Sequence, residues 1–140
     1  MPGNVQPIFA RIGKIGNANI AAAVTGADLT SAALIFTADA TNGSIVNEVR
    51  VKYIPGTSTV ATAFRVFINN GSALATTTNN MLHSELTLAA ITTSQTVGTA
   101  DYAIIFPRGG VVLPPGYRMY ATVGTYSTGT FQVSAYGGDY

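Results

Sequence analysis

The chain has 140 residues, and its seven basic and six acidic side chains give a net charge of +1. Only 9% of the residues are charged and none is a cysteine, whereas an average soluble domain is about 25% charged. These values predict one domain without disulfides, thiolate metal sites or a cysteine nucleophile, and without the basic field that attracts nucleic acids or anionic membranes.

The residue types favour strands over helices along most of the chain. Thr, Val, Ile, Phe and Tyr dominate the apolar segments, and these stiff or bulky side chains favour a pleated surface. Gly, Asn and Pro interrupt the segments at short intervals, which leaves little room for a helix of three turns. The best candidate for a short helix or turn is the alanine-rich segment 18–25.

Eight segments are predicted to be strands, namely residues 8–15, 33–38, 45–54, 60–69, 82–88, 102–106, 117–123 and 130–136. Alternation is clearest in 45–54, where Tyr53 and two valines face one side and Glu48, Arg50 and Lys52 face the other. This pattern indicates a half-buried strand with one solvent-exposed face.

Combinations of Gly with Asn or Pro mark the expected turns, at residues 42–44, 55–57, 69–72, 107–110 and 114–116. Short strands separated by such turns predict an all-β fold over residues 1–140, a single antiparallel β-sandwich of jelly-roll type. An immunoglobulin-like sandwich is the alternative, although the chain lacks the Cys and Trp core markers of true immunoglobulin domains.

The residues that could support enzyme chemistry are few, and His83 is the only histidine. On a strand, His83 and Glu85 share one face while Ser84 points to the other, so we expect Ser84 not to form a nucleophile–base pair with His83. The carboxylates do not repeat at a spacing that paired acid–base chemistry requires. The chain is therefore predicted to be no enzyme, with no catalytic residue and no cofactor.

A metal site is also not predicted. Asp28, Asp39 or Asp101 could combine with loop carbonyls as oxygen ligands for calcium, but the sequence has no ladder of the EF-hand type. A calcium site at these positions is therefore kept only as an alternative.

Aromatic residues crowd the last quarter of the chain, and an exposed tyrosine ring suits contact with a glycan or a protein. The candidate contact residues are Tyr117, Tyr120, Tyr126 and Tyr140. An inward-facing tyrosine at any of these positions would instead belong to the core.

The shortage of charge predicts a surface that lies against other protein subunits. Thr, Ser, Asn, Ala and Gly stand where a monomeric domain usually carries Lys and Glu, so contact with another protein costs little desolvation. A surface with so few charges repels other copies of the chain only weakly, and this favours self-association into a homo-oligomer, either a trimer or a dimer. Residues 1–6 are expected to form an extended arm that, through Pro2, Val5 and the adjoining Pro7, could add a strand to a neighbour's sheet.

Three segments resemble small all-β virion structural proteins of tailed bacteriophages: residues 65–71, 113–118 and 136–140. Each is a strand entering a turn, and the resemblance extends over residues 7–140. It implies a virion structural protein, and capsid decoration or cement proteins are of similar size and are often rich in strands. The resemblance brings no active site with it.

These observations together predict a non-enzymatic head decoration protein that is located in the virion after its production in the host cytoplasm. Its expected partner is the major capsid protein lattice or another virion protein. Nucleic acids and membranes are not expected partners, because the charge is nearly balanced and no run of about 18 apolar residues occurs. The alternative is a module of a tail or fibre that binds a host glycan or receptor.

Overall fold

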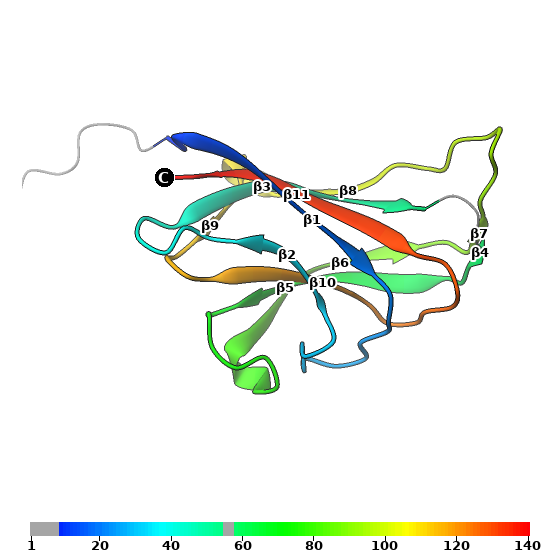
Figure 1. Ribbon diagram of the computed structural model, residues 1–140, viewed down its shortest axis with the longest axis horizontal. Coiled ribbons are helices and arrows are strands. Elements are labelled where there is room, and N and C mark those ends of the chain that lie inside the picture. Colours follow the sequence, from blue (N-terminus) through cyan, green and yellow to red (C-terminus); the bar gives the residue numbers. More distant parts are fainter. Residues whose placement is uncertain (1–8, 55–57) are drawn as a thin grey trace, which may run out of the picture.

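The computed structural model describes residues 9–54 and 58–140, and these residues form two antiparallel sheets packed face to face (Figure 1). The predicted all-β sandwich is thereby confirmed, while its jelly-roll and immunoglobulin-like variants both remain predictions. No helix of the described residues is long and apolar enough to cross a membrane.

Sheet A is the larger sheet, and each of its strands is antiparallel to its neighbour. Its order is β1 (Ile12–Ile20), β11 (Phe131–Asp139), β3 (Ser44–Tyr53) and β8 (Tyr102–Ile105). The short strand β9 (Val111–Leu113) continues the same edge, because it pairs with the first residues of β3 while β8 pairs with later ones. A single turn of 3₁₀ helix, η2 (Pro107–Gly109), separates β8 from β9.

Sheet B lies beneath sheet A and is also antiparallel. Its order is β2 (Ala33–Thr37), β10 (Arg118–Val123), β5 (Thr62–Asn69) and β6 (Asn80–Leu88). A separate two-stranded ribbon joins β4 (Ser58–Thr59) to β7 (Ile91–Thr92), and the 3₁₀ turn η1 (Thr77–Asn79) precedes β6.

The main core lies between the two sheets and consists of aliphatic and aromatic side chains from both. Its largest fully buried members include Phe64 of β5, Met119 of β10 and Phe131 of β11. The alternation predicted for residues 45–54 is confirmed, because Tyr53 and its valine neighbours are buried while Arg50 is exposed. Burial of one face of each sheet therefore fixes which side chains face outward.

A second cluster covers part of the outer face of sheet B. Leu29, Phe67 and Tyr120 form this cluster, which is closed by residues of the loops that precede β2 and β6. Asn80 ties the two loops together, since its side-chain amide donates to the carbonyl oxygens of Ala27 and Leu74, each at 2.7 Å. The two loops therefore cover the part of the outer face of sheet B that holds Phe67 and Tyr120.

On one side of the sandwich, strand β1 of sheet A approaches β2 of sheet B very closely. A Cβ atom added to Gly16 would lie only 1.7 Å from the carbonyl oxygen of Ile35. The Lys14 ammonium also donates to the carbonyl oxygen of Thr37 at 2.7 Å across the same gap. Glycine at position 16 is therefore what allows the two sheets to meet here.

The structure corrects some predicted boundaries and confirms several turns. The first strand begins at Ile12 and continues to Ile20, so the proposed helix or turn at 18–25 is wrong for residues 18–20, which pair with residues 131–133 of β11. Pairing with β11 outweighs the local helix propensity of alanine. The glycines of four predicted turns have positive φ, at positions 43, 71, 109 and 116. The predicted turn at 55–57 and the arm at 1–6 lie outside the described residues.

We expect Gly16→Ala to lower the free energy of unfolding by about 1–3 kcal/mol, because the added methyl group must push apart the backbones of β1 and β2. Gly13→Ala is the matched control on the same strand, since a Cβ atom there meets nothing within 4 Å. Urea denaturation of both variants measures the effect. Equal stability of the two variants would contradict the close approach of the sheets.

Candidate interaction surface

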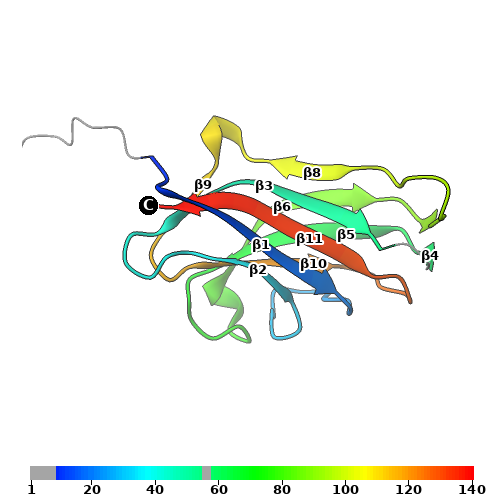
Figure 2. The ribbon, with the colours of Figure 1, turned by 45° about the horizontal axis from the view of Figure 1, so that its top comes forward.

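The outer face of sheet A, which points away from the main core, is open to solvent. Figure 2 is turned toward this sheet and shows β1, β11 and β3 in front, with no described strand lying across them. The outer face of sheet B differs, because its loops and the second cluster cover part of it. The uncovered face is therefore the larger free surface of the fold.

The strand register brings apolar residues of β1, β11 and β8 into one row across this face, with Glu48 of β3 between the last two. Ile15 of β1 pairs with Tyr136 of β11, Tyr136 pairs with Glu48 of β3, and Glu48 pairs with Ile105 of β8. In the adjoining row Ile45 of β3 pairs with Val112 of β9. We call Ile15, Ile45, Ile105, Val112 and Tyr136 the apolar half of the outer face.

Four of the five side chains of the apolar half are exposed, and Ile45 is partly buried. Relative exposure is 64% for Ile15, 74% for Ile105, 61% for Val112 and 37% for Tyr136. Single exposed aliphatic side chains are ordinary on proteins, whereas a contiguous group of them marks a surface that another molecule covers. The apolar half is therefore the strongest candidate for a contact surface.

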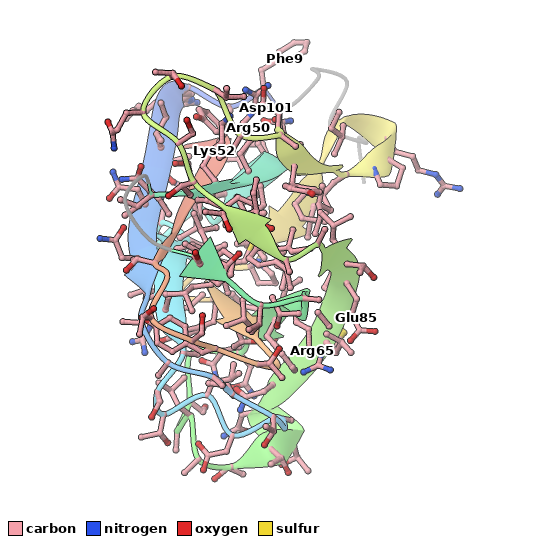
Figure 3. The ribbon with its side chains drawn as sticks, turned by 90° about the vertical axis from the view of Figure 1, so that its right-hand side faces the viewer. Phe9, Arg50, Lys52, Arg65, Glu85 and Asp101 are labelled. Carbon is pink, nitrogen blue, oxygen red and sulfur yellow. The ribbon has the colours of Figure 1, made fainter. Side chains whose placement is uncertain are left out.

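The remainder of the outer face carries charges that are paired within the face. Arg50 Nε contacts the Glu48 carboxylate, and Lys52 Nζ lies 2.6 Å from the Asp101 carboxylate. Figure 3 shows Arg50, Lys52 and Asp101 beside one another. Two acidic and two basic groups cancel, so this charged half presents no net charge to a partner.

The four predicted tyrosines do not gather into one site. Tyr120 is only 4% exposed and belongs to the second cluster. Tyr117 and Tyr126 are partly buried against the main core, and they lie beyond opposite ends of β10. Tyr140 is partly buried, and its N–H donates to the carbonyl oxygen of Gly43 at 3.2 Å. The exposed ring on the outer face is that of Tyr136, which the sequence analysis did not select.

The predicted arm residues lie outside the described residues, so their contacts stay a prediction. These residues are Pro2, Val5 and Pro7.

The expected separation of His83 from Ser84 is wrong. His83 Nδ1 lies 2.8 Å from Ser84 Oγ, because a bulge makes His83 an extra residue where Leu82 and Ser84 pair with successive residues of β5. The ring of His83 packs edge-on against Phe106 at 5.1 Å. Among the described residues no carboxylate bonds to the imidazole, so the pair lacks the third group that orients a catalytic base.

The carboxylates proposed as calcium ligands are held by protein donors. The Asp28 carboxylate accepts from the N–H and hydroxyl of Thr30, and these bonds lower its pKa. The Asp39 carboxylate accepts from the N–H groups of Asn42 and Thr41, which lower its pKa in the same way. Within residues 9–54 and 58–140 no three acidic, histidine or cysteine side chains gather in a way that could hold a metal ion.

No protein family, curated protein or solved structure matches the chain.

The ion pair of Lys52 with Asp101 predicts a pH-dependent contribution to stability. The hydrogen bond and charge of Lys52 lower the pKa of Asp101 below its ordinary 3.8 in the folded state. A lowered pKa gives stabilisation that is present above the ordinary pKa and is lost as the pH falls through the folded-state value. Asp101→Asn should therefore lower the melting temperature slightly at pH 7 and leave it unchanged at about pH 2.

Thermal melts at both pH values measure this difference, and Lys52→Met supplies the control. In the Lys52→Met background, the effect of Asp101→Asn at pH 7 should be smaller, because only the weaker attraction of Arg50 for the carboxylate remains. If Asp101→Asn still changes the melting temperature of the otherwise unchanged chain at low pH, charge is not the cause of the change.

Proposed function

We propose that the chain is a non-enzymatic subunit of a larger protein assembly, to which it binds through the outer face of sheet A. The observation that carries this proposal is the apolar half, where exposed apolar side chains of β1, β11, β8 and β9 lie on both sides of β3 on an uncovered sheet. Covering apolar surface stabilises a complex by about 25 cal/mol per Å². A patch of this kind is therefore better explained by a partner than by contact with water.

The charged half supports the same proposal. Its ion pairs are satisfied within the chain, so a partner need not supply an opposite charge at each position. A neutral, sparsely charged face also loses little hydration when it is covered. Such a face suits a permanent contact with a protein subunit, whereas nucleic acid binding relies on clustered basic groups.

For the assembly itself we propose a bacteriophage head, on which the chain is a capsid decoration protein. The resemblance of residues 65–71, 113–118 and 136–140 to virion proteins supports this choice, as does the low content of charge. Copies that bind only the assembled lattice stabilise that state by mass action, and a dimer or trimer gains further avidity. The tail or fibre alternative has less support, because the burial of Tyr120 removes one of its proposed glycan contacts.

Binding to purified capsids of the virus that encodes the chain tests this function. We expect mass spectrometry to find the chain in the particles, and added protein to cosediment with particles that lack it. Ile105→Lys places a charge in the apolar half and should weaken cosedimentation at least tenfold, which corresponds to about 1.4 kcal/mol.

Val97→Lys is the matched control, because Val97 is 67% exposed but lies in the loop between β7 and β8. It should bind as the unchanged chain does. Absence from the particles together with failure to cosediment would overturn the capsid assignment, while equal binding of both variants would overturn the role of the outer face.

A further inference from the structure

A second candidate site lies on sheet B, where β5 begins and β10 ends. An open groove of about 510 Å³ is lined there by small side chains and by one cation, Arg65. Ala61, Ala63 and Gly124 contribute the small groups, and Thr62 and Thr125 also line the groove. We call this the Arg65 groove, and it belongs to the sheet opposite the one that carries the apolar half.

Strand pairing holds the Arg65 guanidinium in a fixed orientation. Arg65 of β5 pairs with Glu85 of β6, and its Nε lies 2.7 Å from the Glu85 carboxylate (Figure 3). The other end of the guanidinium lies over Gly124, where an added Cβ would be 3.2 Å from Nη1 and 3.7 Å from Nη2. Among the described residues neither Nη group has a hydrogen-bond acceptor, so both remain able to bind a ligand.

Thr62 begins β5, and its side chain lies on the inner face with Phe64, because it pairs with Leu88 of the main core. Its side chain belongs to a residue that is only 6% exposed, and its Oγ accepts a hydrogen bond from the Thr125 N–H at 2.9 Å. The Thr125 hydroxyl donates to the carbonyl oxygen of Ala61 at 2.8 Å. Arg65 lies three positions further along β5 and therefore on the outer face, so the Thr62 hydroxyl is not a donor on the Arg65 side of the strand.

The free Nη groups of Arg65 have the chemistry of a carboxylate site. The two Nη groups of an arginine form a planar fork that matches the two oxygens of a carboxylate. Glu85 occupies only Nε, on the other side of the guanidinium. No aromatic side chain lines the groove, so it lacks the ring platform on which a sugar stacks.

We propose that the Arg65 groove binds the carboxylate of an Asp or Glu side chain presented by a neighbouring protein subunit. The identity of this occupant rests on the proposed function, whereas the carboxylate chemistry rests on Arg65 itself. Glu85 is a positioning residue, because it holds the guanidinium through Nε. A subunit would thus use two separate surfaces, the apolar half and the Arg65 groove.

Nuclear magnetic resonance titration of the full chain with the peptide acetyl-Gly-Asp-Gly-amide tests this proposal. We expect saturable shifts at the backbone amides of Thr62, Gly124 and Thr125 and at the Nε resonance of Arg65. The peptide acetyl-Gly-Asn-Gly-amide should cause none of these shifts, because it lacks the carboxylate. Absence of saturable shifts with the Asp peptide would overturn the site.

Two variants probe the arginine fork. Arg65→Lys keeps the charge but removes the fork, and Gly124→Ala keeps Arg65 but adds a methyl group 3.2 Å from Nη1. Each variant should weaken peptide binding at least fivefold. If Arg65→Lys does not fold, Gly124→Ala still tests the proposal. Arg108→Lys is the control, because this arginine lies in η2 and outside the groove. Unchanged affinity in Gly124→Ala and any folded Arg65→Lys would overturn the proposal.

A parallel titration with glucuronate separates the two sources of a carboxylate. Tighter binding of glucuronate than of the Asp peptide would overturn the protein side chain as occupant. Failure of this inference is distinguishable from failure of the proposed function, because the titration needs no capsid. Ile105→Lys should bind the Asp peptide as tightly as the unchanged chain does but should bind capsids more weakly. The reason is that the apolar half and the groove lie on different sheets.

Discussion

The inward face of β3 is the constraint on which the rest of the structure depends. Its valines and Tyr53 are buried in the main core, so the intervening Glu48, Arg50 and Lys52 must face outward. β3 also pairs with three other strands, β11, β8 and β9. Because paired residues on neighbouring strands point to the same side of a sheet, the inward and outward faces of β3 extend across the whole of sheet A. The outer face, with its apolar and charged halves, is the result.

The two sheets differ in what covers their outer faces. On sheet B, Phe67 and Tyr120 are exposed neither to solvent nor to a partner, because the loops around Leu29 and Leu74 enclose them. On sheet A, Ile15 and its neighbours across the strands have no such cover among the described residues. The chain therefore buries the outward aromatic residues of one sheet itself and leaves the outward aliphatic residues of the other for a partner.

Alternation within a strand could be predicted from the sequence, whereas neighbours across strands could not. The faces of residues 45–54 follow from period two alone. The row that joins Ile15 to Ile105 depends on register, and register depends on bulges such as the one in β3 near Asn47. The contact between His83 and Ser84 was missed for the same reason. The number of tyrosines near the end of the chain did not predict a contact site, because proximity in the sequence does not show which rings are covered by loops.

The separation of the two candidate surfaces follows from the sandwich itself. The main core lies between them, so a change in the apolar half leaves the strands that hold Arg65 in place. Each surface uses a different interaction, since one offers aliphatic area and the other offers a directed cation. Aliphatic contact supplies affinity without fixing orientation, and the guanidinium fork fixes orientation with little area. A subunit that carries both is suited to contact two neighbours in a regular lattice, as the proposed role requires.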